Sequence, residues 1–335
     1  MRIFALCAFL LLVSVPAHST GPRLSELRPR GAQKGAVFAL TLVGTGLSDE
    51  AKVLTNLPGT LTRLTPSRDP KRRGIELPFI VELNPDAPVD LYPIRVQTPD
   101  GLTNLLFFSV GAFPRVREEE SENDSSPLAQ VVEIPVTING TLDGADRDWY
   151  RFQGEAGQRL VFEVEARRAG SGVDPAIRVV DTAGDIVARN DDARGLGVDS
   201  RLEVTLPRSG DYFVELHDSR FSEQEENFYR LKIGAFTYAE GIFPLGWKRG
   251  GEVEVAFSGG NLAKPITVRP DLTLLGETEN FTSVSVPGEA GSLPFRFVVS
   301  DNAEILEPSG HTVKTLEPEV VMNGRLSEPG EIDRY

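Results

Sequence analysis

The oxygen-bearing side chains of residues 117–127 are the part of this sequence whose residue types point most directly to chemistry. Glu120, Glu122, Asn123 and Asp124 stand close together in this acidic segment. Hard cations such as Ca²⁺ bind six to eight oxygen ligands, which clustered carboxylates and an amide carbonyl supply. The segment therefore has the character of one half of a calcium site.

Asp146 and Asp148 are candidates for the other half of such a site. They open a predicted strand, and alternate residues of a strand point to the same face of its sheet. Each group also has a plainer interpretation, which the residues alone leave open. The acidic segment has the composition of a solvated linker, and Asp148 is equally suited to a strand-start aspartate that hydrogen-bonds to the backbone.

Residues suited to catalysis are sparse by comparison. The only histidines beyond the leader are His217 and His311, and no Gly-x-Ser-x-Gly or His-Glu-x-x-His signature accompanies them. Acidic residues are abundant, but glycosidase chemistry needs a defined pair of carboxyl groups facing a cleft. We assign no catalytic and no cofactor-binding residue, and we expect this chain not to be an enzyme.

The charge balance argues against nucleic acids as partners. The chain has 35 Lys and Arg residues against 49 Asp and Glu residues, a formal net charge of −14. Most of its surface therefore repels a phosphate backbone. Its single cysteine, Cys7, leaves no means to build a disulfide framework or a thiolate metal site.

The first residues have the features of a secretory signal peptide. Arg2 is followed by an apolar run that ends at Val15 and is too short to span a bilayer. Small residues predict cleavage after Ser19, with Ala17 as the alternative, and no later segment is apolar enough for a membrane span. We therefore expect an exported protein that is secreted, periplasmic or held at the cell surface.

The elements that must position the candidate ligands are β-strands. Runs of alternating apolar residues, such as those at 38–42, 160–164 and 212–216, recur along the chain, and a period of two is typical of strands with one buried face. Turn-forming residues, among 32 Gly and 24 Pro, separate these runs. The sequence predicts an all-β fold of tandem antiparallel β-sandwich domains, immunoglobulin-like and jelly-roll-like.

Internal similarity orders these domains as A–B–A′–B′. Residues 29–47 resemble residues 244–262, and an Asn-Gly-x-Leu motif at 139–142 recurs at 323–326. The second B unit ends close to its first core strand, so we expect this chain to be a fragment of a longer protein. The alternative is that residues 318–335 are a frayed tail. The predicted parts are a signal peptide at 1–19, an immunoglobulin-like sandwich at 22–112, an acidic linker at 113–127, a second sandwich at 128–236, a shortened immunoglobulin-like module at 237–300, and at 301–335 a linker with the start of a truncated repeat.

An ordered series of short motifs runs through the second unit. The series occupies residues 139–142, 146–152, 156–158, 174–175, 181–184, 190–192, 210–214 and 229–231. It resembles the bacterial pre-peptidase C-terminal (PPC) domain, a β-sandwich related to the collagen-binding domains of secreted clostridial collagenases. The A units are similar to TIG-type immunoglobulin-like modules, on the Gly-x-Gly-Leu turn at 44–47 and the strand spacing.

The resemblance to collagen-binding domains implies a ligand set for calcium. In those relatives an acidic Glu-x-Glu-x-Asn-Asp-like run just before the sandwich binds Ca²⁺ together with aspartates of the sandwich. This chain reads Glu-Ser-Glu-Asn-Asp, one residue shorter before the asparagine. The second copy has only dispersed glutamates, including Glu304 and Glu307, and is expected to lack the site. The implied ligands are Glu120, Glu122, Asn123, Asp124, Asp146 and Asp148.

Three functions agree with these expectations. The first is a non-catalytic exported protein whose PPC-like sandwich is a calcium-stabilised adhesion, secretion or substrate-binding module. The second is the non-catalytic N-terminal part of a secreted peptidase or other hydrolase. The third is a collagen-binding or carbohydrate-binding module, for which Tyr212, Phe228 and Tyr229 would form an exposed aromatic strip. The expected partners are extracellular proteins or polysaccharides, and the oligomeric state stays open.

Overall fold

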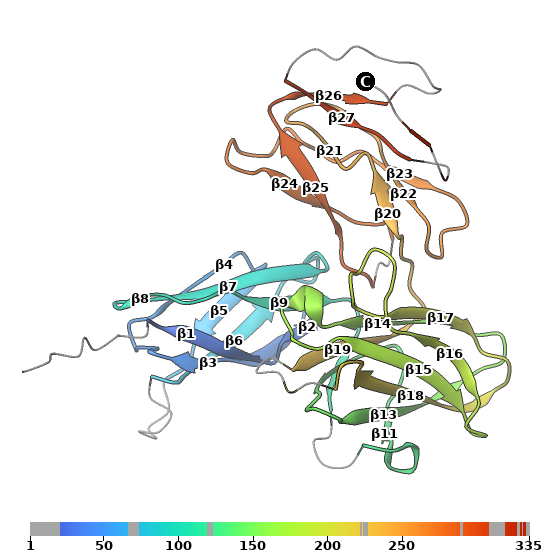
Figure 1. Cartoon of the computed structure of the whole chain (residues 1–335). Helices are drawn as coiled ribbons and strands as arrows, with labels where there is room; N and C mark the ends of the chain where they lie inside the picture. Colours follow the sequence, from blue (N-terminus) through green and yellow to red (C-terminus); the bar gives the residue numbers. More distant parts are fainter. Residues whose placement is uncertain are drawn as a thin grey trace, which may run out of the picture.

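The chain folds into three β-sandwiches in series, as Figure 1 shows. This computed structural model describes residues 21–65, 74–118, 123–221, 223, 227–288, 291–307, 319–326, 329 and 331–332. The predicted all-β fold of tandem antiparallel sandwiches is confirmed. In those ranges the helices are two short 3-10 turns, η1 (Ser126–Leu128) and η2 (Arg167–Ala169), and none could cross a membrane.

The first sandwich buries one face of each of its two sheets. Residues of β6 alternate between buried and partly exposed, as period-two patterning requires. Leu40, Phe79, Ile94 and Phe108 lie in the shared core. One sheet has the order β1 (Arg23–Arg28), β3 (Val37–Thr45), β6 (Glu76–Leu83), β5 (Gly59–Arg63). The other has the order β2 (Gly31–Gln33), β9 (Leu106–Gly111), β7 (Asp90–Thr98), β4 (Lys52–Thr55), with β8 (Gly101–Leu102) paired to β7.

The second sandwich has two five-stranded sheets around the largest core. Part of the segment predicted as a linker belongs to it, because β10 pairs in parallel with β12. One sheet has the order β10 (Arg115–Arg117), β12 (Val136–Thr141), β19 (Phe228–Gly234), β14 (Arg159–Glu165), β17 (Arg201–Thr205). The other has the order β11 (Gln130–Val131), β13 (Arg147–Gly154), β18 (Gly210–Asp218), β15 (Pro175–Asp181), β16 (Ile186–Asn190).

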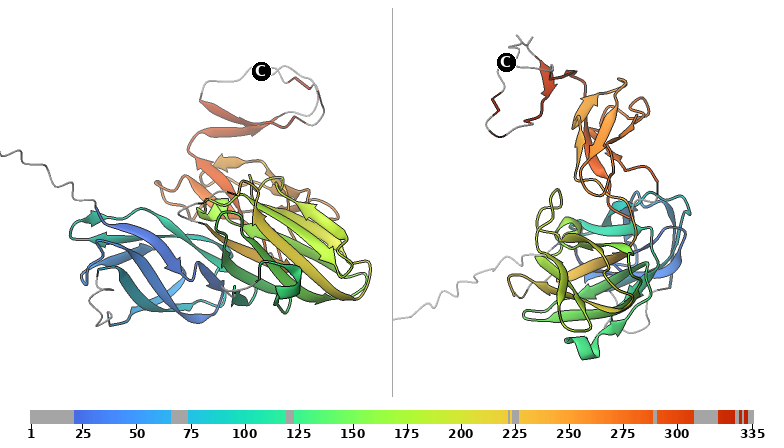
Figure 2. Two further views of the ribbon diagram at one scale, coloured as in Figure 1. Left: turned by 60° about the horizontal axis from the view of Figure 1, so that its bottom comes forward. Right: turned by 90° about the vertical axis from the view of Figure 1, so that its right-hand side faces the viewer.

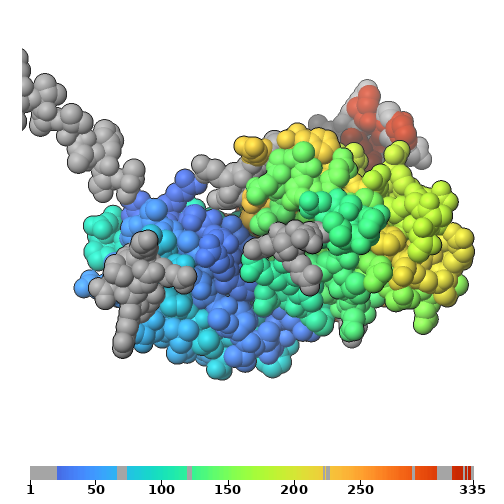
Figure 3. All heavy atoms as spheres, turned by 90° about the horizontal axis from the view of Figure 1, so that it is seen from below, coloured from blue at the N-terminus to red at the C-terminus, as the bar shows by residue number. Residues whose placement is uncertain are grey.

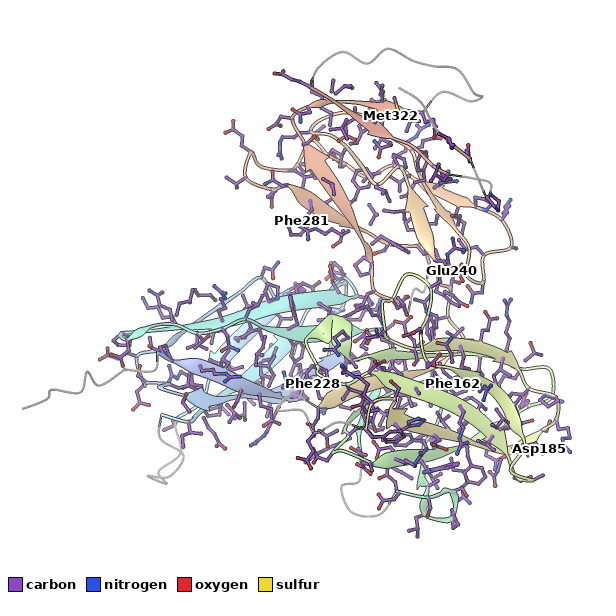
Figure 4. All side chains as sticks on the ribbon, in the orientation of Figure 1. Phe162, Asp185, Phe228, Glu240, Phe281 and Met322 are labelled. Atoms are coloured by element: carbon purple, nitrogen blue, oxygen red, sulfur yellow. The ribbon has the colours of Figure 1, made fainter. Side chains whose placement is uncertain are left out.

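Strands β14 and β19 are buried on both faces, unlike the other strands of the second sandwich. Their inner faces carry apolar residues such as Phe162, which Figure 4 labels, and Leu231. Their outer faces carry charged residues, including Glu163 and Arg230, that are also buried. The first and third sandwiches cover this outer face, so the contact between domains is built on ionic groups.

The third sandwich is smaller and lies above the contact between the first two (Figure 1). Its Ser283 hydroxyl donates to Asp90 Oδ2 of the first sandwich at 2.9 Å. One sheet has the order β20 (Gly241–Phe243), β22 (Val255–Ser258), β23 (Ile266–Val268), and the other β21 (Gly246–Lys248), β25 (Phe295–Ser300), β24 (Phe281–Val284). A final parallel pair, β26 (Ala303–Leu306) and β27 (Val320–Asn323), lies beyond it (Figure 2).

The internal repeat is visible in the backbone as well as in the sequence. The parallel pair β2 and β9 of the first sandwich recurs as β21 and β25 of the third. Arg30 O accepts the Ser109 amide at 3.0 Å, and Leu245 O accepts the Val298 amide at 3.0 Å. The pair β10 and β12 likewise recurs as β26 and β27. The two copies therefore follow the same chain path where they match in sequence.

Candidate metal centre

Five buried polar residues meet where the chain enters the second sandwich, and we call them the acidic pocket. Glu118 follows β10, Asn123 lies just before η1, and Tyr229 belongs to β19. Asp148 and Tyr150 point inward from β13, where buried and exposed residues alternate. All five are at most 8 % exposed. Members of the pocket are thus contributed by two strands, β13 and β19, and by the acidic segment: Glu118, Asn123, Asp148, Tyr150 and Tyr229.

Hydrogen bonds join the members of the acidic pocket directly. The Tyr229 hydroxyl donates to Asp148 Oδ2 at 2.6 Å, and the hydroxyl groups of Tyr229 and Tyr150 are hydrogen-bonded to each other. The Asn123 amide donates to Glu118 Oε1 at 3.3 Å. The other carboxylate oxygen of Glu118, Oε2, accepts the Thr141 backbone amide at 2.9 Å. The pocket is therefore a connected network of oxygen atoms.

Gly140 explains why the Asn-Gly motif lies beside this network. A Cβ atom at this position would be 2.3 Å from the Tyr229 hydroxyl oxygen and 2.6 Å from Glu118 Oε2. Both distances are far below van der Waals contact, so a side chain here would displace the two groups. The motif is a packing requirement of the acidic pocket.

The electrostatics of the pocket disfavour a second negative charge. Burial raises the pKa of Asp148 to about 10, and the neighbouring Glu118 carboxylate contributes to the rise. Burial and the same two acids also hold the pKa values of Tyr150 and Tyr229 well above their usual range. In the chain alone, Asp148 therefore keeps its proton at neutral pH, and a bound cation would favour its ionised form.

The described ligand candidates divide between the pocket and its rim. Asn123 and Asp148 belong to the pocket, and the Trp149 amide donates to Asn123 O at 2.8 Å, which fastens the acidic segment to β13. Asp146 lies at the rim, where its Oδ1 accepts the Arg147 amide at 2.8 Å. Burial raises the pKa of Asp146, and the charge of Asp124 raises it further. Asp124 and Asp146 are thus near enough to repel each other.

Comparison with known proteins assigns this part of the chain to a family. Residues 146–218, which include Asp148 and Tyr150, match the family model of the bacterial pre-peptidase C-terminal domain. These residues form a PPC domain. The predicted resemblance is therefore confirmed for the second sandwich.

The relatives of the PPC domain cover only part of this chain. A probable subtilase-type serine protease of Deinococcus radiodurans is 39% identical over 72 residues, which are 21% of this chain and 10% of that protein. The pre-peptidase C-terminal domain of a Bacillus anthracis collagenase is 18% identical, with a TM-score of 0.25, over 31% of this chain and 93% of that one. A periplasmic inhibitor of g-type lysozyme from Aeromonas hydrophila is 20% identical, with a TM-score of 0.24, over 32% of this chain and 97% of that one.

Two of the predicted ligands, Glu120 and Glu122, lie outside the described residues. Within the described ranges, no group of three or more His, Cys, Asp or Glu side chains is arranged to hold a metal ion. The acids there influence one another in series: Glu118 and Asp146 both raise the pKa of Asp148, and Asp124 raises that of Asp146. The donor set suits a hard cation in kind, because its atoms are carboxylate and amide oxygens, and a full shell requires further oxygens.

Sequence reasoning missed Glu118, Tyr150 and Tyr229 as members of the site. Glu118 is the first glutamate of the acidic run. It could have been predicted, since it directly follows a short strand whose central residue is apolar. Tyr150 shares its face with Asp148, so period-two alternation also pointed to it. Tyr229 belongs to a strand, 81 positions beyond Asp148, and no local sequence pattern predicts its contact with Asp148.

The start of the second B unit repeats one part of this site. The Glu307 amide donates to Asn323 O at 2.9 Å, as the Glu118 amide donates to Asn139 O at 3.0 Å. Glu307 Oε2 accepts the Arg325 amide at 2.8 Å, which matches the bond from Thr141 to Glu118. Glu307 therefore occupies the position of Glu118. The expectation that this copy binds no calcium stays a prediction.

The expected aromatic strip is wrong. Tyr212, Phe228 and Tyr229 are 2 %, 5 % and 1 % exposed, because their strands are covered by the opposite sheet or by the first sandwich. His217 of β18 makes packing and polar contacts within the domain. Its ring stacks on Phe221 with 5.5 Å between the ring centres, and its Nδ1 lies 3.4 Å from Glu215 Oε1. His311 lies outside the described residues.

Proposed function

We propose that this chain is a non-catalytic, exported multidomain protein in which the PPC domain is a calcium-stabilised adhesion or binding module. The observation that carries the proposal is the acidic pocket, where Asp148 and Glu118 are buried together without a cationic side chain among their described neighbours. Burying two carboxyl groups side by side is costly unless a proton or a cation compensates them. Calcium would supply that compensation.

The residues of the chain would hold the ion through oxygen atoms only. Asp148 and Glu118 would contribute from the pocket and Asp124 and Asp146 from the rim, with Glu120, Glu122 and Asn123 of the acidic segment as the remaining ligands. Calcium bound there would supply positive charge that offsets the repulsion between these acids. Since the acidic segment follows β10, directly after the first sandwich, the bound ion would also fix the angle between the two domains.

Thermal unfolding with and without calcium tests this proposal. A ligand that binds only the folded state at a hundred times its Kd stabilises that state by about 2.7 kcal/mol. We expect millimolar Ca²⁺ to raise the Tm, EDTA to reverse the rise, and Asp124→Asn or Asp148→Asn to weaken it. Asp86→Asn, at an exposed acid in a turn of the first sandwich, is the matched control. Identical melting curves in Ca²⁺ and EDTA would remove calcium from the proposal.

A second candidate is that the chain forms the non-catalytic part of a secreted peptidase. It is favoured by the relative described as a probable subtilase-type serine protease, although only a tenth of that protein is matched. Sequencing the gene beyond codon 335 and assaying the full product on casein distinguishes the two candidates. A protease domain downstream with measurable hydrolysis would select this one.

A further inference from the structure

The third sandwich exposes a contiguous set of apolar residues, Leu245, Gly246, Phe281 and Val298, which we call the apolar face. Val298 of β25 is 50 % exposed, Phe281 of β24, labelled in Figure 4, is 51 % exposed, and Leu245, just before β21, is 60 % exposed. Gly246 and Phe281 are the cross-strand neighbours of Val298 on its two sides. A contiguous apolar set of this kind marks a contact surface, unlike apolar residues scattered singly.

In the first copy of the repeat, the equivalent position is covered by the PPC domain. Gly31 and Ser109 of the parallel pair β2 and β9 correspond to Gly246 and Val298. A Cβ atom at Gly31 would lie 2.5 Å from Arg230 Cζ, and Arg230 Nη1 donates to Ser109 O at 3.2 Å. Strand β19, which carries Arg230, therefore lies directly on this face of the first sandwich. Figure 3 shows the first sandwich, in blue, packed against the PPC domain, in green.

Leu245 also occupies a position that contacts β19 in the first copy. It corresponds to Arg30, since the backbone carbonyl groups of both residues accept the equivalent amide of the neighbouring strand. The Arg30 guanidinium lies 4.0 Å from the centre of the Phe228 ring, and Phe228 is the first residue of β19. The apolar face is thus the counterpart of the surface that holds β19 in the first copy.

Strand β27 has an edge without a partner among the described strands, unlike its counterpart β12. Strand β12 pairs with β10 on one side and with β19 on the other, whereas β27 pairs within the described residues with β26 alone. Ile138 and Leu142 are buried in the PPC core. Their counterparts are Met322, labelled in Figure 4, which is partly exposed, and Leu326, which is 68 % exposed. The second copy therefore presents a strand edge and apolar side chains where the first copy has β19.

The two surfaces differ in chemistry, and this difference indicates which side chains suit the apolar face. In the first copy the Ser109 hydroxyl donates to Glu165 Oε2 at 2.8 Å. Val298 has no hydroxyl group, so a glutamate buried against it would lose that donor, and burying a carboxylate without its partners is unfavourable. Leu245 likewise carries no charge. Apolar side chains buried against this face would instead be stabilised by the hydrophobic effect.

We propose that the apolar face and the edge of β27 together bind a second PPC domain, the one whose sheet β26 and β27 begin. In it, the strand equivalent to β19 would pair with β27 and lie on Val298, with apolar residues at the positions of Glu165 and Arg230. The PPC domain of another copy of this chain does not meet these conditions, because its own first sandwich already contacts Glu165 and Arg230. Calcium is not needed for this contact, so it can be tested separately from the metal centre.

Reading the gene beyond codon 335 and purifying its complete product tests this docking site. We expect a second PPC domain that continues from β27, with apolar residues at the positions of Glu165 and Arg230. Val298→Asp in this product would bury a charge against that domain and release it. Limited proteolysis in EDTA should then cleave between the third sandwich and the second PPC domain at least roughly tenfold faster, because cleavage follows the population of the open form.

Two controls separate undocking from loss of folding. Leu274→Asp, at an exposed apolar residue in a turn of the third sandwich, should leave the cleavage rate unchanged. Val298→Asp in the 335-residue chain should leave the Tm unchanged, since Val298 is exposed there.

Three results would overturn the proposal: a gene that ends at codon 335, a second PPC domain with Glu and Arg at the two named positions, or equal cleavage of the Val298→Asp and Leu274→Asp products. Analytical ultracentrifugation of the 335-residue chain adds a fourth. Dimers that Val298→Asp abolishes would assign the apolar face to a second copy of this chain instead.

Discussion

The PPC domain buries charge in two places and compensates it differently in each. The acidic pocket combines Glu118 and Asp148 with two tyrosines, and its described neighbours include no ion-paired cation. On the outer face of β14 and β19, the ionic junction combines three acids with four basic side chains, none of them more than 19 % exposed at the side chain. The members of the ionic junction are Glu163, Glu165, Arg168, Asp199, Arg201, Arg230 and Lys232.

The ionic junction also reaches into both neighbouring sandwiches. The Ser109 hydroxyl of the first sandwich donates to Glu165 Oε2 at 2.8 Å, and Arg230 Nη1 donates to Ser109 O at 3.2 Å. From the other side, Lys232 Nζ donates to Gly291 O at 2.8 Å. The Ser292 hydroxyl donates to Glu163 Oε2 at 3.0 Å. The ionic junction therefore holds three domains together with groups that the chain supplies itself.

The two sites show that the neighbours of a buried acid, rather than burial alone, decide its ionisation. Burial would raise the pKa of Glu163, but Lys232, Arg168 and Arg201 outweigh it and hold the pKa far below the usual range. The pKa of Glu165 is lowered for the same reason, by the basic side chains around it. Asp148 is buried with the Glu118 carboxyl group beside it, and its pKa is raised to about 10. The ionic junction is complete in the chain, whereas the acidic pocket requires a proton or a cation.

The largest effect should come from unbalancing the ionic junction. Lys232→Met removes the partner that Glu163 and Glu165 share, and Lys232 is only 1 % exposed. Breaking one side of a buried ion pair costs about 3–5 kcal/mol, because the remaining charge is left uncompensated. We expect that loss in urea unfolding, with the third sandwich losing protection from proteolysis first.

Lys248→Met, at an exposed lysine of β21, is the control and should change stability little. Adding Glu165→Gln to Lys232→Met should recover part of the loss, because it removes one of the two acids that have lost Lys232 as a partner. A Lys232→Met protein within about 1 kcal/mol of the wild type would contradict the view that the junction depends on charge balance.

A smaller effect should follow from crowding the acidic pocket. Gly140→Ala places a Cβ atom against the Tyr229 hydroxyl and Glu118 Oε2. Overpacking of this kind typically costs about 1–3 kcal/mol. Thermal unfolding measures it, with Gly241→Ala as the control, since a Cβ at Gly241 would meet no atom within 4 Å. Equal Tm values for the two variants would show that the pocket is loosely packed.

The fold could be predicted from the sequence because, in the strands of a sandwich, apolar and polar residues alternate. This local pattern shows which face of each strand is buried. Asp148, Tyr150 and Phe152 share the inner face of β13, as period two requires. Repetition supplied the domain order, because the same turns and asparagines recur in both copies. The aromatic strip failed for the opposite reason: whether Phe228 faces solvent depends on how the first sandwich packs, which no local pattern contains.

The candidate site was only partly predictable. The acidic segment and Asp148 could be predicted because acidic residues close together in the sequence can be recognised directly. The contact from Tyr229 to Asp148 could not, because it joins residues 81 positions apart. The ionic junction was missed altogether. Charged residues on the outer faces of β14 and β19 have the pattern of a solvated surface, and only the neighbouring domains bury them.

The finest test separates the two sites by the sign of their pH dependence. The pKa of Asp148 rises from 3.8 to about 10 on folding, so its proton stabilises the fold fully below pH 3.8, and this stability is lost as the pH rises toward 10. The pKa values of Glu163 and Glu165 fall on folding, so their contribution is present above pH 4.5 and is lost as the pH falls below it.

In EDTA, between pH 6 and 8, only Asp148 among these three acids should change the stability. We expect the wild-type protein to lose up to about 2.7 kcal/mol over these two pH units, because unfolding releases about one proton from Asp148 and each pH unit then lowers the free energy of unfolding by about 1.4 kcal/mol. Asp148→Asn should flatten that slope, whereas Glu163→Gln should leave it intact while lowering stability throughout. A slope that persists in Asp148→Asn would assign the titration to another group and would remove the contrast between the pocket and the junction.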